Sequence, residues 1–156
     1  MSKSDLSHQS ATLGGDADFL ERFTVLATSL GLPSSVARVF GYLLACQPPQ
    51  QTSKEIQANL RLSAGAVNEA VNTLLEFGLV ERSKKQSSRQ YIYQIRPSGF
   101  QAMIKQRVHL MGEVARLAED GLKLDPDNAR LQTMQTVYSQ AEVVLSDYLA
   151  GIEQDI

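Results

Sequence analysis

The stretch that decides the fold is residues 52–95, TSKEIQANLRLSAGAVNEAVNTLLEFGLVERSKKQSSRQYIYQI. It opens with Thr52 and, three residues later, Glu55. This spacing is typical of a helix N-terminus, because the hydroxyl and the carboxylate can each satisfy a free backbone N–H group. A short helix is therefore expected to run from here through about Leu60.

A second short helix is expected directly after the turn at residues 61–62. Ser63 can cap its start, and Gly78 suits its end because glycine tolerates a left-handed backbone. Between them, Val67, Val71 and the pair Leu74 and Leu75 recur at helical spacing and should face a core. Two capped helices joined by a tight turn predict a helix-turn-helix.

Two strands should follow, at residues 79–82 and 90–95. Both are rich in β-branched and aromatic residues, and a polar segment at 83–89 joins them. The sequence therefore predicts a β-hairpin, or wing, directly after the helix-turn-helix.

Amphipathic helices are expected on both sides of this stretch. Residues 16–32 carry an apolar face that includes Phe19 and Phe23, and a further helix begins at Pro33 and ends before Pro48. From Ser98 the pattern is helical almost to the end, with a break at residues 125–127. Apolar residues on both long helices recur every 3.5 residues, a pattern suited to helix packing; they are Ile104, Val108, Met111, Ala115, Ala118 and Leu122 on the first, and Leu131, Met134, Tyr138, Ala141, Leu145, Tyr148 and Ile152 on the second.

The expected fold class is mainly α with a small β-hairpin wing. We expect a flexible tail at 1–15, an N-terminal dimerisation helix at 16–32, a winged helix-turn-helix domain at 33–97 and a C-terminal helical dimerisation region at 98–156. A chain of 156 residues is long enough to bury a core of this kind.

The charge of the chain is unevenly distributed. Although its formal net charge is -2, the segment from Arg82 to Gly112 holds seven basic residues and no acidic one. A basic segment between acidic flanks is compatible with contact to nucleic acid despite the overall sign.

Other classes of protein find little support in the sequence. No apolar run is long enough to span a membrane and the first residues lack a secretory core, so we expect a cytoplasmic protein that does not bind a membrane. The single cysteine, Cys46, cannot form an internal disulfide, and nothing indicates a metal site or a cofactor. An enzyme would need a nucleophile with a base or a paired carboxylate, and only Cys46, His8 and His109 offer such chemistry. We expect no catalytic residues.

The order of elements resembles that of the multiple-antibiotic-resistance-regulator (MarR) family of winged-helix repressors, over almost the whole chain. Within this family, residues 31–33 (GLP), 37–44 (ARVFGYLL) and the Pro48-Pro49 turn look most like the glycine-betaine-synthesis-regulator (GbsR) branch. The resemblance implies a homodimer that binds double-stranded DNA, most often as a repressor.

The resemblance also implies that residues 64–77 form the recognition helix. The positions left outward by the core assignment are Ala64, Gly65, Asn68, Glu69, Asn72 and Thr73. The first two are small, while Asn68 and Asn72 carry paired donors and acceptors suited to adenine edges. Glu69 could accept from a cytosine amine. The candidate DNA-binding residues are Thr52, Ser53, Lys54, Ser63, Ala64, Gly65, Asn68, Glu69, Asn72, Arg82, Lys84, Lys85, Ser88 and Arg89.

In the wing, Lys84 and Lys85 are expected on phosphates and Arg89 in the minor groove. The family commonly has an aspartate just before this arginine, which holds other basic side chains; here Ser87-Ser88 stands instead, so the rigidity of the wing is in question. The alternative is that these charges merely keep a hairpin tip soluble, and exposure to solvent alone would equally explain Asn68 and Asn72.

A lone winged helix contacts a short stretch of duplex, so specificity calls for two copies about 34 Å apart. We expect the terminal helices to form the dimer interface, through Phe19, Phe23, Leu131, Tyr138, Leu145, Tyr148 and Ile152, because helix 16–32 has no evident partner in the winged domain. The alternative is a closed monomeric bundle.

The family resemblance implies a small-molecule effector pocket between the dimerisation helices and the winged domain. Its candidate lining residues are Phe40, Tyr42, Met103, Arg107 and His109, although core packing explains the aromatic and methionine positions equally well. The effector is not identified by the sequence.

Two further alternatives remain open. Cys46 could act as a redox switch, but it lies at the end of an apolar helix without a neighbouring base, which favours an inert thiol. The chain could instead be a winged-helix module that binds a protein and not DNA; the acidic Glu69 favours this alternative and the basic wing argues against it.

Overall fold

The computed structural model describes residues 13–154. The chain divides into two compact units, one that extends to Gly99 and one that begins at Phe100. Most of the tail expected at residues 1–15, together with His8, lies outside the described residues. No helix among residues 13–154 has the length and apolar character needed to cross a membrane.

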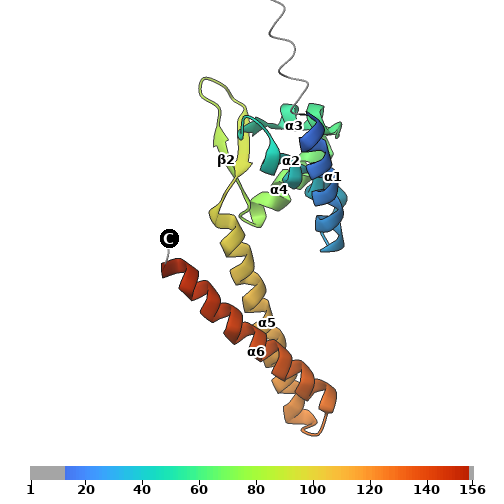
Figure 1. The fold of residues 1–156 in the computed structure, drawn as a ribbon, viewed down its shortest axis with the longest axis vertical. Helices are drawn as coiled ribbons and strands as arrows, with labels where there is room; N and C mark the ends of the chain where they lie inside the picture. Colours follow the sequence, from blue (N-terminus) through green and yellow to red (C-terminus); the bar gives the residue numbers. More distant parts are fainter. Residues whose placement is uncertain (1–12, 155–156) are drawn as a thin grey trace, which may run out of the picture. The chain divides into compact units, whose positions relative to one another are not determined.

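The first unit contains four helices and a small sheet (Figure 1). Along the chain, two helices precede a short strand, two more helices follow it, and the two strands of the β-hairpin come last. The loop of the β-hairpin projects from the sheet (Figure 1). The elements are α1 (Leu13–Ser29), α2 (Ser34–Ala45), β1 (Gln51–Thr52), α3 (Ser53–Leu60), α4 (Ala64–Glu76), β2 (Val80–Lys84) and β3 (Tyr91–Ile95).

Helix α1 begins earlier than expected. It starts at Leu13, so residues 13–15 are helical and do not belong to a tail. Its C-terminal end is as expected, because Gly31 adopts a left-handed φ of 98° and the Leu32 N–H donates to the Ala27 carbonyl at 3.1 Å.

The expectation that this helix lacks a partner in the winged domain is wrong. Helix α1 packs on α2, with the rings of Phe23 and Phe40 5.2 Å apart and nearly perpendicular. At Gly41, a side chain would lie only 2.7 Å from the Phe23 ring, so the missing Cβ lets the two helices approach. Sequence periodicity gave the apolar face of α1 but could not say that α2 covers part of it.

The core of the first unit is formed by the residues that the helical patterns place inward. Val39, Ile56, Val67 and Leu74 are each fully buried. The helix-turn-helix is confirmed, with α3 and α4 separated by a turn in which Arg61 adopts a left-handed φ of 52°.

The sheet has one more strand than the sequence indicates. Its order is β1-β3-β2, and both pairs are antiparallel. Strand β1 comprises only Gln51 and Thr52, which pair with Tyr93 and Ile92. A two-residue strand is too short to produce a recognisable alternation, so only its pairing partner reveals it.

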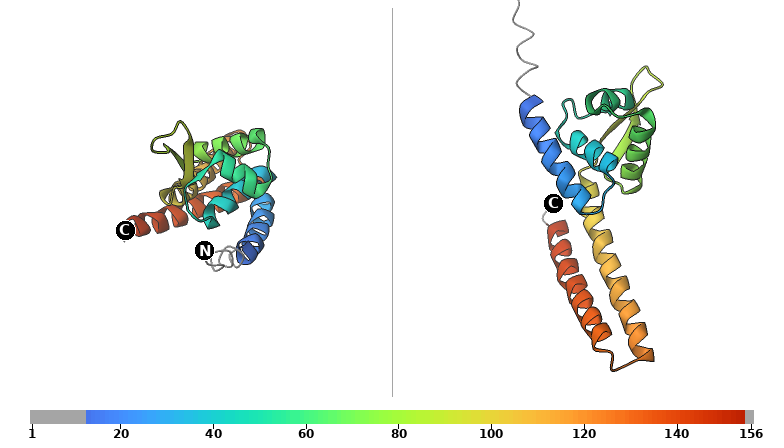
Figure 2. Two further views of the ribbon diagram at one scale, coloured as in Figure 1. Left: turned by 90° about the horizontal axis from the view of Figure 1, so that it is seen from above. Right: turned by 90° about the vertical axis from the view of Figure 1, so that its right-hand side faces the viewer.

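The second unit consists of two long helices, α5 (Ser98–Leu124, whose first two residues belong to the first unit) and α6 (Ala129–Gln154). They run antiparallel and side by side (Figure 2). Val108, Ala115 and Ala118 of the expected seam on α5 are buried. At Gly121, a side chain would lie 2.8 Å from the end of the Leu131 side chain of α6, so the missing Cβ leaves room for Leu131.

The seam on α6 differs from the expected 3.5-residue repeat near its C-terminal end. Leu149 is buried, whereas Tyr148 is 66% exposed. The straight α-helix has 3.6 residues per turn, so the packed face drifts by roughly 20° per heptad away from a 3.5-residue repeat. Over the length of α6 this drift carries Tyr148 out of the seam and brings Leu149 into it.

Candidate nucleic-acid interface

The start of α3 is held by the expected capping box. The Glu55 N–H donates to Thr52 Oγ1 at 3.2 Å, and the Thr52 N–H donates to Glu55 Oε2 at 2.7 Å. The backbone hydrogen bond from Thr52 is the main reason that the pKa of Glu55 lies below its ordinary value, and the nearby charge of Lys85 adds to this effect. The cap therefore fixes Ser53 and Lys54 at the first turn of α3.

Helix α4 presents a polar face to solvent. Ser63 caps it, with Ser63 Oγ accepting from the Ala66 N–H at 3.2 Å, and Val67, Ala70, Val71 and Leu74 are buried. The residues expected to face outward are exposed apart from Thr73, which is half-buried; the exposed ones are Ala64, Gly65, Asn68, Glu69 and Asn72.

Gly65, in the first turn of α4, has open space around it. A side chain built at Gly65 would meet nothing within 4 Å. The glycine is therefore not required by contacts among the described residues, and its small size leaves the start of α4 open to an outside partner.

The two faces of the wing differ in charge. Arg82 lies opposite Tyr93 and Lys84 opposite Tyr91, and directly opposed residues share a face of an antiparallel sheet. The Arg82 guanidinium lies 4.4 Å from the centre of the Tyr91 ring, in the geometry of a cation–π contact. The opposite face carries Glu81 and Gln94, which are hydrogen bonded to each other.

The wing loop is held by hydrogen bonds within it. The Lys85 N–H donates to the Gln90 carbonyl at 3.0 Å, and the Gln90 N–H donates to Ser88 Oγ at 3.1 Å. Ser87 adopts a left-handed φ of 61°. Ser88 thus supplies a hydrogen-bond acceptor directly before Arg89, where the family commonly has an aspartate, and this hydrogen bond helps to hold the wing loop.

A hollow of about 340 Å³ lies between α3, α4 and the wing. Its lining combines cations, hydroxyl groups and amides, and contains no carboxylate. The lining residues are Thr52, Ser53, Lys54 and Gln57 from the start of α3, Asn68 from α4, and Arg89, Gln90, Tyr91 and Tyr93 from the wing.

The structure therefore brings together five of the candidate DNA-binding residues, namely Thr52, Ser53, Lys54, Asn68 and Arg89. Of the others, Ser63 and the remaining α4 positions form the exposed face of α4, while Arg82, Lys84, Lys85 and Ser88 lie on the hairpin. Sequence reasoning missed Gln57, Gln90, Tyr91 and Tyr93. The alternation of the two tyrosines on β3 could have indicated that both share one face.

The five residues expected around an effector come from both units. Phe40 belongs to the core of the first unit, and the Tyr42 hydroxyl donates to Gln51 Oε1 at 2.7 Å. Burial is the main cause that raises the pKa of Tyr42 to about 12. On α5, Met103 is half-buried and Arg107 and His109 are exposed.

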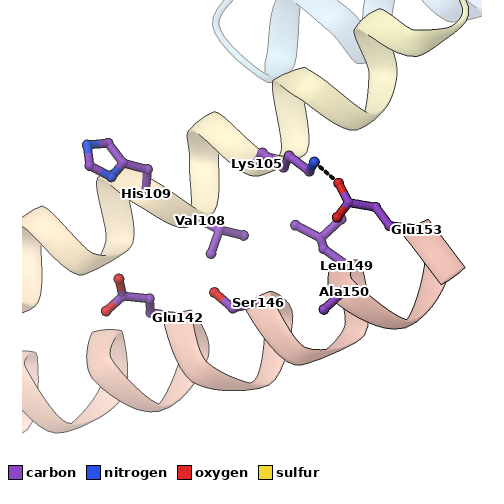
Figure 3. Close-up of a pocket in the computed structure, with 8 residues that line it drawn as sticks. All are labelled: Lys105, Val108, His109, Glu142, Ser146, Leu149, Ala150 and Glu153. Carbon is purple, nitrogen blue, oxygen red and sulfur yellow. Dashed lines mark hydrogen bonds and ion pairs between the residues drawn. The ribbon is translucent and has the colours of Figure 1, made fainter.

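His109 borders a second hollow, of about 300 Å³, which lies between α5 and α6 (Figure 3). Val108 faces Leu149 across it, and an ion pair between Lys105 and Glu153 joins the two helices at one end. None of the other four expected effector residues lines this hollow.

Cys46 is half-buried at the end of α2. Its Sγ donates to the Leu43 carbonyl at 3.7 Å. Within residues 13–154, no three side chains of the His, Cys, Asp or Glu type form a group that could hold a metal ion.

The residues expected at a dimer interface fall into two groups. Phe19, Tyr138 and Tyr148 are 42%, 37% and 66% exposed. The others are half-buried within their own units; they are Phe23, Leu131, Leu145 and Ile152.

No protein-family model matches the sequence. The HTH-type transcriptional regulator MmpR5 of Mycobacterium tuberculosis (strain ATCC 25618 / H37Rv) is 30% identical over 142 residues, which cover 88% of this chain and 86% of the relative. A solved crystal structure of a transcriptional regulator superposes with a TM-score of 0.73 at 30% identity, over 90% of this chain and 99% of that one. The similarity to each extends into both compact units.

Proposed function

We propose, from the premise that this chain belongs to the MarR-like family of winged-helix transcriptional regulators, that it represses transcription as a homodimer bound to a specific site in duplex DNA. The observation that carries the proposal is the exposed polar face of α4 next to a hollow that contains Lys54 and Arg89. The family is not enzymatic, and no catalytic role is assigned to any residue.

The exposed face of α4 is proposed to read the bases. Asn68 and Asn72 can each form paired hydrogen bonds with an adenine edge, and Glu69 can accept from a cytosine amine. Ala64 and Gly65 leave room for the helix to approach the floor of the major groove, and Gly65 in particular faces open space.

The first turn of α3 and the wing are proposed to bind the backbone. Arg89 is the wing residue that the family resemblance places in the minor groove instead. Thr52, Ser53, Lys54 and Ser63 lie at the two capped helix starts, while Arg82, Lys84, Lys85 and Ser88 lie along the β-hairpin. Contacts of this kind fix the orientation of the protein on the duplex but carry no sequence information directly.

The homodimer is proposed to form through apolar surface on α1 and α6 that no other part of its own unit covers. Val25 and Leu26 on α1, Leu30 just after its end, and Val137, Val144 and Tyr148 on α6 are each more than half exposed. Exposed apolar surface of this extent marks an interaction site. Phe19 and Tyr138 extend these two surfaces.

We further propose that the chain belongs to the GbsR branch of this family. Membership of the GbsR branch rests on residues 31–33 and 37–44. A small-molecule effector would change DNA affinity only by its different affinity for two spacings of the α4 helices. We propose that the protein works in the cytoplasm, where a repressor meets its DNA.

The experiment that tests the DNA proposal is fluorescence anisotropy of the full chain with labelled duplex from the region upstream of its own gene, over a series of salt concentrations. The expected result is site-selective binding with a steep salt dependence that is shallower for Arg89→Ala, because each neutralised phosphate releases counterions. Arg130→Ala, which removes an exposed cation from the start of α6, is the matched control. The absence of binding to any duplex at low salt would contradict the proposal and favour a module that binds protein.

A further inference from the structure

We infer that the hollow between α3, α4 and the wing binds one phosphate of the DNA backbone, and that Lys54 from α3 and Arg89 from the wing both contact this phosphate. This inference rests on the proposed function as a DNA-binding protein. It assigns Arg89 to the backbone, whereas the family resemblance places the wing arginine in the minor groove.

The charges around the hollow favour the binding of an anion. Lys54 and Arg89 both line it, and within the described part of the chain neither forms an ion pair or a side-chain hydrogen bond. The nearest carboxylate on the same helix, that of Glu55, accepts from both the N–H and the hydroxyl of Thr52 and feels the charge of Lys85. Glu55 is therefore engaged at the cap, and the two cations of the hollow have no counter-charge there.

The uncharged groups of the lining can donate hydrogen bonds. Gln57 Nε2 donates to Ser53 Oγ at 3.1 Å, so the Ser53 hydroxyl hydrogen remains available for a further acceptor. Asn68, Gln90 and Tyr91 add amide and phenol donors. A phosphodiester oxygen only accepts hydrogen bonds, so a lining rich in donors and cations and without carboxylates matches its chemistry.

The conformation of the wing loop directs Arg89 toward the helices. Ser88 accepts from the Gln90 N–H and thereby fixes the backbone on both sides of Arg89. In this conformation Arg89 lines the same hollow as Lys54 and Asn68, which lie on α3 and α4. An arginine in the minor groove would instead extend away from these two helices.

The size of the hollow fits part of a nucleotide. Its volume of about 340 Å³ lies at the lower end of the roughly 300–1,000 Å³ typical of small-molecule sites. That space can admit a phosphate together with part of an adjoining sugar. Because Asn68 of α4 borders the hollow, the phosphate bound there would set the register of α4 relative to the bases.

The test is a scan in which single phosphates of the bound duplex are replaced by uncharged methylphosphonates. Affinities are measured for the wild-type chain, Lys54→Gln, Arg89→Gln and the double variant. We expect one position in each half-site at which the replacement weakens wild-type binding about tenfold or more but hardly changes binding by the double variant. The slope of log affinity against log salt should fall by about 1 per half-site for the pair, because one shared phosphate is involved and not two.

Lys85→Gln is the matched control, since Lys85 is a wing cation outside the hollow. Its loss should add to the effect of the methylphosphonate at the shared position. The inference is overturned if Lys54→Gln and Arg89→Gln are sensitive to different phosphates. It is also overturned if 2,6-diaminopurine, which adds an amino group in the minor groove, weakens wild-type binding but not binding by Arg89→Gln. Failure of every variant and the wild type to bind DNA would instead contradict the proposed function.

Discussion

The winged unit and the helical hairpin of α5 and α6 bury their apolar residues to very different extents. In the winged unit, Ile56, Val67 and Leu74 have no exposed surface. In the hairpin, Leu117 is 68% exposed and Leu124 is 90% exposed, although both lie on a helix of 27 residues.

This difference shows that the first unit has a hydrophobic core of its own, whereas each helix of the second unit buries only the face that contacts the other helix. Two helices can cover only one face of each other, so a hairpin leaves further apolar surface uncovered. The winged unit should therefore behave as an independently stable module, whereas the hairpin should depend on a second copy of the chain.

The largest effect is expected from Leu74→Ala in the core of the winged unit. Leu74 is fully buried, and loss of a buried leucine side chain lowers the free energy of unfolding by about 3–5 kcal/mol. Denaturant unfolding followed by circular dichroism measures the free energy of unfolding of the variant and the wild type. Leu124→Ala serves as the control and should cost less than about 0.5 kcal/mol; equal losses at the two positions would show that the comparison is wrong.

The next largest effect is expected on the hairpin from Val144→Glu. Val144 is 66% exposed and shares a face of α6 with Val137 and Tyr148. A charge buried at the proposed dimer interface should raise the dimer dissociation constant about 30-fold or more, equivalent to about 2 kcal/mol.

Sedimentation equilibrium of the variant and the wild type measures this constant. Thr136→Glu, which introduces the same charge at an exposed polar position of α6, should leave it nearly unchanged. If the Val144 variant dimerises as tightly as the wild type, this face of α6 is not the interface.

A smaller effect is expected from the cap of α3. Thr52→Ala removes the acceptor of the Glu55 N–H and should lower the free energy of unfolding by about 1 kcal/mol. The loss should appear in urea unfolding at neutral pH. A loss below the error of the measurement would mean that the packing of the winged unit, and not its cap, holds α3.

The same cap predicts a dependence on pH. The pKa of Glu55 in the folded chain lies below its ordinary value of 4.5, chiefly because the Thr52 N–H donates to the carboxylate. The stabilisation is therefore present above pH 4.5 and is lost as the pH falls through the lowered pKa. The stability of Glu55→Gln, measured over the same range, should change less with pH than that of the wild type.

The smallest effect concerns Tyr42. Burial raises its pKa to about 12, so its contribution to stability is fully present below about pH 10, the ordinary tyrosine pKa, and is lost as the pH rises toward 12. Ultraviolet titration of tyrosine ionisation should contain a step near pH 12 that Tyr42→Phe removes. A titration unchanged by the substitution would contradict the buried environment of this hydroxyl.

The sequence predicted much of the winged unit because its signals are local. The Thr52–Glu55 capping box and the Ser63 cap each depend on groups three residues apart. The inward positions of α4 follow from helical spacing alone. The hollow could not be predicted in the same way, because Lys54, Asn68 and Arg89 come together only after the wing folds next to α3 and α4.

The sequence by itself determined where most helices begin and end, which faces are apolar and which segment is basic. Caps, turns and periodicity depend on neighbours along the chain, and their physics is complete within a few residues. Only the tertiary structure decided that Phe23 packs on Phe40 and that Gln51 and Thr52 form a strand against β3. Each of these depends on contacts between distant segments, which the spacing of residues along one segment does not specify.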